Sequence, residues 1–212
     1  MVDSKIFNIE QNATDFIRTL EKPNQKYKRP ITVILVGIPA SGKSYFCQNI
    51  VSSLPFVLVS ENSIQSFLVP QITFFERGTG QILDFVRETV KQLTRMGLNS
   101  ILDMNLKTYA QREMFRLTVK EAGGEVVTVH LTCPETVCFD KIKQRNSEIQ
   151  SGDVKGFIMD WDYFLFEANS IEESIQSENA ITYDSSTNGP QMKKITKYLE
   201  DHLEVQEIQP MK

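Results

Sequence analysis

The sequence predicts an α/β fold in which helices cover both faces of a parallel sheet. Short apolar runs alternate along the chain with segments of helical periodicity, which is typical of strands joined by helical crossovers. With 212 residues, 41% of them hydrophobic and 24% charged, the chain has the composition of a globular domain that buries a core. This composition excludes a disordered, collagen-like or coiled-coil protein.

Five short apolar runs are predicted to be the strands. In chain order they are residues 31–36, 56–59, 100–102, 126–131 and 180–183. Six segments with helical periodicity lie between and after these runs. They are residues 44–53, 80–96, 108–122, 134–145, roughly 159–177, and 190–202. Each strand is thus followed by a helix, as crossovers in a parallel sheet require.

The N-terminal residues 1–29 are predicted to be a helix and a linker that form an appendage to the main domain. A short amphipathic helix from about residue 8 to 21 is indicated by four apolar side chains near helical spacing, which are Ile9, Phe16, Ile17 and Leu20. The main domain is predicted to cover residues 30–203. Residues 204–212 are expected to be a tail that frays.

Charge and cysteine content narrow the function classes. The net charge of −4 disfavours a protein that coats nucleic acid, because such a protein must neutralise many phosphates, although a local basic site stays open. Three cysteines without metal-ligand spacing are read as free thiols in a reducing cytosol, and we expect a cytoplasmic location. No apolar run approaches the roughly 18 residues of a transmembrane helix, and no secretory signal is recognised.

The clearest motif is residues 37–44, which fit G-x-x-x-x-G-K-[ST] at every fixed position between a predicted strand and a predicted helix. Its glycines let the backbone turn tightly, and the helix that follows points its free N–H groups at an anion. Lys43 is expected to reach the β- and γ-phosphates of ATP, and the Ser44 hydroxyl to ligate Mg²⁺. The predicted nucleotide-binding residues are Gly37, Pro39, Ala40, Ser41, Gly42, Lys43, Ser44 and Tyr45.

Two carboxylates follow predicted strands and are candidates for catalysis. Asp103 ends the third strand, where it is placed to hold Mg²⁺ through water or to accept a proton from an attacking hydroxyl. Alternatively, it only starts a turn and caps the helix that follows. Glu61 follows the second strand and is either a base or a substrate anchor. Alternatively, this position only begins a helix that Ser60 or Asn62 caps.

A cation-rich helix is predicted to end at Arg145, and a polar stretch around residues 146–158 is predicted to be a lid. A cation at a lid hinge can fold over a transferring phosphoryl group, so Arg145 is a catalytic candidate. The alternative is that Lys141, Lys143 and Arg145 only complement the dipole of the helix. The aromatic residues between 160 and 164 either stack on a base or pack in the core.

Taken in order, the motifs resemble those of the P-loop kinases related to the 5′-hydroxyl polynucleotide kinases, with zeta-toxin-type and gluconate-type kinases as cousins. The matching segments are residues 37–44, 57–64, 101–105 with Arg112 downstream, 131–135, and 145–146. The resemblance covers about residues 30–200 and implies an AAA-type P-loop kinase domain. It implies a five-stranded parallel sheet in the order 2-3-1-4-5 with a helical lid, and transfer of the γ-phosphoryl group of ATP to a hydroxyl with Mg²⁺.

The sequence departs from that family at two places. An aspartate and an arginine are usual after the second strand, where this chain has Asn62 or Ser63 and Gln65. A second arginine is often found in the lid, where this chain has residues 148–150, Glu-Ile-Gln. The base would then be Glu61 or Asp103.

Three hypotheses follow for the function. The first is an ATP- and Mg²⁺-dependent kinase that acts on a hydroxyl of a nucleotide, a nucleic-acid end or a modified nucleoside. The second keeps the fold but takes a sugar or another small metabolite as the acceptor. The third is a nucleotide-binding module that transfers no phosphate. The negative net charge disfavours a long binding surface along a nucleic acid. If the acceptor is a nucleic acid, contact with its end or with a single nucleotide is therefore expected.

Overall fold

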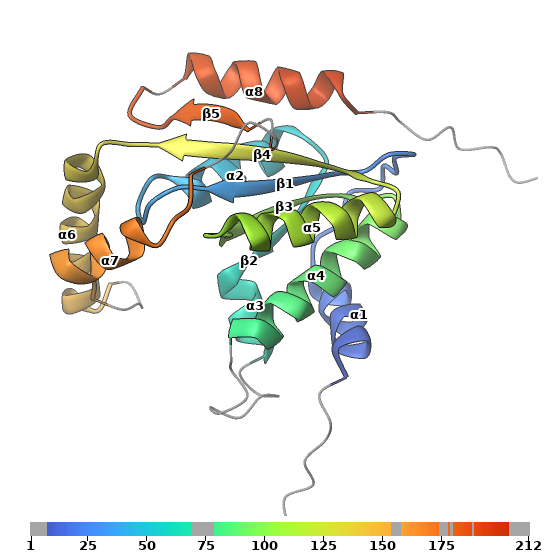
Figure 1. The fold of residues 1–212 in the computed structure, drawn as a ribbon, viewed down its shortest axis with the longest axis horizontal. Coiled ribbons are helices and arrows are strands. Elements are labelled where there is room, and N and C mark those ends of the chain that lie inside the picture. The colour runs from blue at the N-terminus through green and yellow to red at the C-terminus, as the bar shows by residue number, and fades with distance from the viewer. Residues whose placement is uncertain are drawn as a thin grey trace, which may run out of the picture.

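A computed structural model describes residues 8–68, 79–153, 158–173, 178, 180–187 and 189–203. The core of the fold is a sheet of five parallel strands in the order β2-β3-β1-β4-β5 (Figure 1). The strands are β1 (Ile31–Val36), β2 (Phe56–Ser60), β3 (Asn99–Asn105), β4 (Glu125–Thr132) and β5 (Ile181–Asp184). The predicted fold class and strand order are confirmed.

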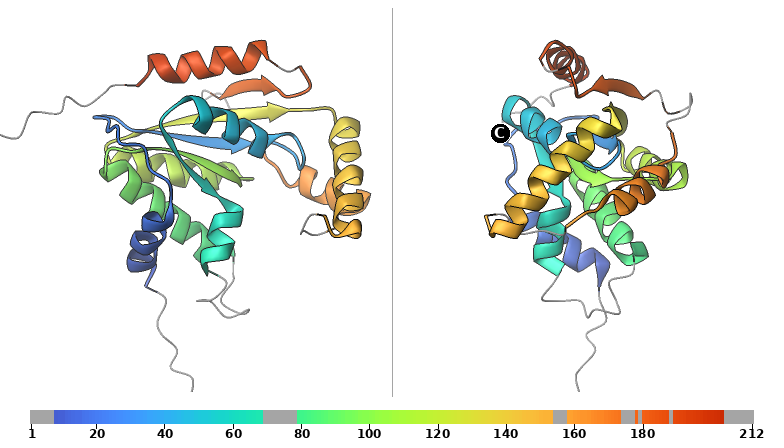
Figure 2. Two further views of the ribbon diagram at one scale, coloured as in Figure 1. Left: turned by 180° about the vertical axis from the view of Figure 1, so that it is seen from behind. Right: turned by 90° about the vertical axis from the view of Figure 1, so that its left-hand side faces the viewer.

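Helices cover both faces of this sheet (Figures 1 and 2). On one face lie α2 (Lys43–Ser53) and α8 (Pro190–Asp201), and on the other α4 (Thr79–Arg95) and α5 (Tyr109–Glu121). Alternate residues of β1 point to the two faces, so Val33 and Leu35 pack with α2 while Ile34 packs with α4. Every residue of β1 is buried, which explains why this strand is a continuous apolar run.

The N-terminal helix α1 (Ile9–Thr19) packs against α4 and belongs to the core on that face. Its Ala13, Phe16 and Ile17 are buried, and the Phe16 ring lies 5.4 Å from that of Phe85. The predicted amphipathic helix is therefore present. Its apolar face, however, is part of the main core, so the helix does not pack as an appendage.

Two predicted helix ends differ from the observed ones. Helix α6 (Glu135–Ser151) continues past Arg145 and ends where Gly152 adopts a left-handed conformation with φ of 85°. Helix α7 (Trp161–Asn169) is shorter than the predicted segment 159–177. The predicted lid therefore begins inside a helix, and its residues 154–157 lie outside the described residues.

Helices α6 and α7 lie beyond the carboxyl ends of the strands, at the end to which the arrows of β1 and β4 point (Figure 1). A small apolar cluster of Cys138, Ile142 and Phe164 joins the two helices. In open α/β sheets this end is where ligands bind. Within the described ranges, no helix has the length and apolar composition needed to cross a bilayer.

Candidate active site

The loop between β1 and α2 folds back tightly on itself. Ala40 and Gly42 have positive φ angles of 59° and 95°, and the Ser41 amide donates to the Ile38 carbonyl at 3.1 Å. A Cβ on Gly37 would lie 2.6 Å from the Ser41 hydroxyl and 2.9 Å from the Leu131 carbonyl, so only glycine fits there. The sequence motif thus reflects steric limits on this loop.

Lys43 extends back along this loop. Its ammonium donates to the Gly37 carbonyl at 2.8 Å and to the Ile38 carbonyl at 3.0 Å. Burial lowers the pKa of Lys43 to about 8, and the negative charge of Asp103 offsets part of that effect. Lys43 is the first residue of α2, so its ammonium and the free amides of that helix end meet in the same loop.

Ser44 and Asp103 come together across the sheet, because β1 and β3 are neighbours. The Ser44 hydroxyl donates to Asp103 Oδ1 at 3.0 Å. Burial raises the pKa of Asp103, whereas the Ser44 hydrogen bond and the charge of Lys43 act in the opposite direction. Asp103 does not cap the next helix, since Thr108 caps α5 and forms a capping box with Gln111.

The oxygens of Ser44 and Asp103 fit Mg²⁺. Hydroxyl and carboxylate oxygens are hard ligands, and Mg²⁺ completes its octahedron largely with water and substrate phosphates. Among the described residues, no group of three His, Cys, Asp or Glu side chains could hold a metal ion. The Ser44 hydroxyl and the Asp103 carboxylate therefore form a two-oxygen site at the end of the phosphate loop that could hold a metal ion.

Glu61 begins helix α3 (Glu61–Leu68) directly after β2. The helix is capped by Ser60, whose hydroxyl accepts from the Ser63 amide at 3.1 Å, while the Ser63 hydroxyl accepts from the Ser60 amide at 3.2 Å. Capping therefore does not require Glu61, which is exposed. Its negative charge is one of those that raise the pKa of Lys43 against the effect of burial.

Arg145 lies on the exposed surface of α6. In the described part of the chain, its side chain takes part in no ion pair, and its predicted catalytic role stays a prediction. The neighbouring Lys143 pairs with Asp140 at 3.1 Å and lies 4.9 Å from the centre of the Phe139 ring. These two contacts are local to the helix.

Two aromatic residues of α7, Trp161 and Phe164, pack against Phe139 of α6. Tyr163 and Phe166 are exposed. The Trp161 ring lies 4.5 Å from Phe139, edge to face, and 5.3 Å from the buried Phe164. Asp160 caps this helix by accepting from the Tyr163 amide at 2.8 Å. For Phe164 the core interpretation is therefore correct.

The α6–α7 cluster also contacts the phosphate loop, since Ile38 and Ala40 pack against it. On the other side, a Cβ on Gly42 would lie 3.6 Å from that of Ser185, in the loop after β5. Tyr45 is 61% exposed at the start of α2. Sequence reasoning missed Ser185, because only the strand order brings the β5 loop beside the phosphate loop.

Comparison with known families gives one match. A family model described as an AAA domain matches residues 33–155, more than half of the chain. This segment contains the phosphate loop, Glu61, Asp103 and Arg145. No curated protein sequence matches the chain significantly.

Several solved structures share the fold at low sequence identity. Kti12 from Chaetomium thermophilum, in complex with ADP-AlF3, has a TM-score of 0.63 and 12% identity over 80% of this chain and 97% of its own. A sugar kinase from Janibacter sp. HTCC2649 has a TM-score of 0.56 and 15% identity, with 81% and 95% covered. The Mycobacterium tuberculosis APS kinase, in complex with AMPPNP and APS, has a TM-score of 0.55 and 14% identity, with 82% and 96% covered. The chain thus shares the fold of these solved structures, two of which are kinases.

Proposed function

The chain belongs to the AAA domain family, and from this premise we propose that it is a phosphotransferase that moves the γ-phosphoryl group of ATP to a hydroxyl acceptor. The observation that carries the proposal is the hydrogen bond of 3.0 Å between Ser44 and Asp103, beside the partly buried Lys43. A phosphate loop, a cation and a carboxylate that meet at one sheet edge are the parts that phosphoryl transfer needs.

Each part has a role in the proposal. The amides of the loop and of the α2 N-terminus bind the phosphates, and Lys43 contacts the β- and γ-phosphate oxygens. Ser44 and Asp103 hold Mg²⁺, whose charge offsets that of the same oxygens. Because Asp103 is engaged with Ser44, the exposed Glu61 is the better placed of the two carboxylates to orient the acceptor hydroxyl. Arg145 is proposed to approach the transferring group from α6.

For the acceptor, we favour a hydroxyl of a nucleotide, a nucleic-acid end or a modified nucleoside. The order of motifs that resembles the polynucleotide kinase-like group supports this choice. A sugar or another small metabolite is the alternative within the same fold, and one of the solved structures that share it is a sugar kinase.

A nucleotide-binding module without transfer is the second candidate function. It is favoured by Asn62 and Gln65, which are exposed on the first turns of α3 where related kinases carry an aspartate and an arginine. An amide cannot accept a proton as a carboxylate does.

Transfer from labelled ATP to a panel of acceptors tests the proposal. The panel holds a 5′-hydroxyl oligonucleotide, free nucleosides and several sugars, each with and without Mg²⁺. Lys43→Ala is expected to lower kcat/KM on the order of 10²–10³-fold, because it removes a cation from the phosphates. Lys197→Ala, an exposed lysine on α8, is the matched control and should transfer at the wild-type rate.

The outcomes separate the candidates. Equal transfer by Lys43→Ala and the wild type would contradict the proposed site. Tight ATP binding by the wild type without transfer to any acceptor would favour the nucleotide-binding module. Transfer to sugars alone would select the small-molecule alternative.

A further inference from the structure

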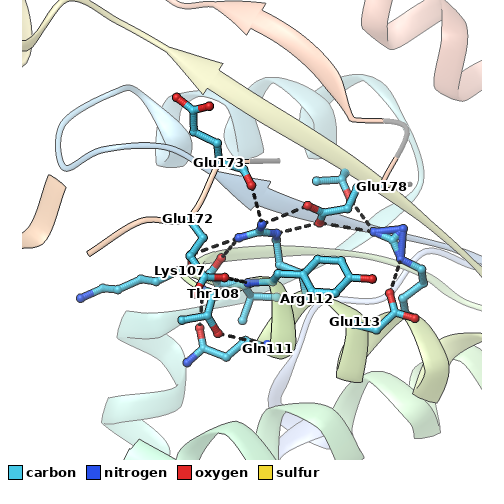
Figure 3. A network of polar contacts seen from close by, with 12 residues as sticks. Lys107, Thr108, Gln111, Arg112, Glu113, Glu172, Glu173 and Glu178 are labelled. Atoms are coloured by element: carbon cyan, nitrogen blue, oxygen red, sulfur yellow. Dashed lines mark hydrogen bonds and ion pairs between the residues drawn. The ribbon is translucent and has the colours of Figure 1, made fainter. Parts of the chain in front are cut away.

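A buried ion pair lies under the turn between β3 and α5, away from the phosphate loop. Arg112, on α5, is 0% exposed, and Glu178, just before β5, is 3% exposed. The Arg112 guanidinium donates two parallel hydrogen bonds to the Glu178 carboxylate, from Nε to Oε1 at 2.7 Å and from Nη2 to Oε2 at 3.0 Å. Figure 3 shows Arg112 at the centre of this network.

The same guanidinium also binds backbone carbonyls. Its Nη1 donates to the Leu106 carbonyl at 3.2 Å and to the Lys107 carbonyl at 3.1 Å. Its Nη2 donates to the Glu173 carbonyl at 3.3 Å. Arg112 therefore joins two chain segments, the turn after β3 and the segment that follows α7 (Figure 3). A planar fork with five donors suits this task, whereas lysine cannot reproduce it.

The turn that Arg112 holds comes directly after an irregular part of β3. Val33 of β1 pairs with Ile101, and two residues later Leu35 pairs with Asn105, which lies four residues after Ile101. Strand β3 therefore contains extra residues between these two pairings and bulges there. Asp103 lies inside the bulge. Bulges next to active sites re-aim side chains, and here the bulge carries the carboxylate that meets Ser44.

The chain that leaves α7 is fixed to the same turn by further contacts. Glu172 donates its amide to the Lys107 carbonyl at 2.9 Å and accepts from the Tyr109 amide at 2.6 Å. The Lys107 ammonium pairs with Glu167 of α7 at 2.6 Å. The end of β3 and the exit from α7 therefore form one unit, with Arg112 and Glu178 at its buried centre.

We propose that Arg112 and Glu178 are positioning residues of the candidate active site. They hold the turn after the β3 bulge, so that Asp103 faces Ser44, and they fix the chain after α7 to that turn. A buried ion pair is costly to desolvate and adds little net stability, which favours a role in fixing geometry. This inference rests on the proposed function, since it takes Asp103 to be a metal-holding carboxylate.

The test measures how much Mg²⁺ strengthens the binding of AMPPNP. Titration calorimetry with and without Mg²⁺ gives this gain for the wild type, Arg112→Lys and Glu178→Gln. We expect both variants to bind metal-free AMPPNP as the wild type does, because the phosphate loop is untouched. The gain from Mg²⁺ should fall about tenfold, as when an outer partner of a metal ligand is lost. In transfer assays with Mg²⁺ kcat should fall, and KM for ATP should rise because the Mg²⁺-dependent part of the binding is weaker.

The control separates positioning from stability. Val119→Ala removes a fully buried side chain on the same helix α5 without touching the turn after β3. It should lower Tm but keep the Mg²⁺ gain. If Arg112→Lys and Glu178→Gln also lower Tm and keep the full gain, the pair is only structural and the proposal is overturned.

Substitutions at less buried positions test the proposal if the Arg112 and Glu178 variants do not fold. Lys107→Met and Glu172→Ala each remove one contact to the same turn from a less buried position. Both should reduce the Mg²⁺ gain in the same direction by a smaller factor, and an unchanged gain in both would refute the proposal. A wild type without any Mg²⁺ gain would instead refute the metal site of the proposed function.

Discussion

Lys43 and Arg112 make the same kind of contact after the neighbouring strands β1 and β3, yet their roles differ. Lys43 donates to the successive carbonyls of Gly37 and Ile38 after β1. Arg112 donates to the successive carbonyls of Leu106 and Lys107 after β3. Each cation thus holds the backbone where a strand of the sheet ends.

The difference lies in the carboxylate. Arg112 has a buried partner in Glu178, whereas Lys43 takes part in none of the ion pairs between described residues. Burial without a paired carboxylate lowers the pKa of Lys43 to about 8. Arg112, which is buried with its own carboxylate, serves the architecture, whereas the partly buried Lys43 is available to an anionic ligand.

Stability measurements test this contrast most strongly. Arg112→Met removes the guanidinium that holds the buried Glu178 carboxylate at 2.7 Å, while the longer 3.5 Å contact of Glu178 with Arg116 stays. We therefore expect the free energy of unfolding to fall by about 3–5 kcal/mol. Lys43→Met removes a poorly solvated charge and should leave the free energy of unfolding unchanged or higher. Urea unfolding followed by circular dichroism measures both. Equal destabilisation by the two variants would remove the distinction.

The double variant Arg112→Met, Glu178→Met sharpens the same contrast. The double variant removes the buried carboxylate together with the Arg112 guanidinium, so part of the lost free energy of unfolding should return. If the double variant is less stable than Arg112→Met alone, the loss comes from packing and not from the buried charge.

The pH dependence of nucleotide binding is the next largest effect. Triphosphate favours the charged form of Lys43, so binding above pH 8 must be accompanied by protonation of this residue. The affinity for AMPPNP should therefore fall by up to about tenfold for each pH unit above 8. Lys43→Arg, which stays charged, should bind with a flat profile. A flat wild-type profile up to pH 10 would contradict the lowered pKa.

The smallest effect concerns His130, which lies on β4 near the Arg112 network. Burial lowers the pKa of His130, the charges of Glu173 and Glu178 act against this, and that of Arg112 adds to it. Because the unfolded chain then binds more protons, stability should fall as the pH drops below 6.5. We expect a Tm difference of no more than about 2 °C between His130→Asn and the wild type at pH 5. No difference in their pH profiles would rule out this contribution.

The phosphate loop could be predicted because its geometry is local. Gly37, Gly42, Lys43 and Ser44 lie within one turn of chain, and each satisfies a steric or chemical need of that turn. The approach of Asp103 to Ser44 follows once β1 and β3 are neighbours. That neighbourhood came from the resemblance to a kinase family, since alternation of strands and helices alone leaves the strand order open.

The Arg112–Glu178 pair could not be predicted in this way. Its partners are 66 residues apart, and nothing local to either position indicates the other. The bulge in β3 also has no sequence signal, because Leu102 and Met104 continue an ordinary strand pattern. By contrast, the end of α6 has a sequence signal in Gly152, but the cations up to Arg145 are equally typical of a last helical turn and predict an earlier end.

The docking of α1 on α4 has a consequence for synthesis of the chain. The apolar face with Phe16 and Ile17 is made first, while the helix that covers it begins only at Thr79. At a translation rate of about 5–20 residues per second, that face waits several seconds on the ribosome for its partner. During this interval the nascent chain presents an apolar segment that α4 does not yet cover, and transiently exposed apolar surface of this kind is what chaperones bind.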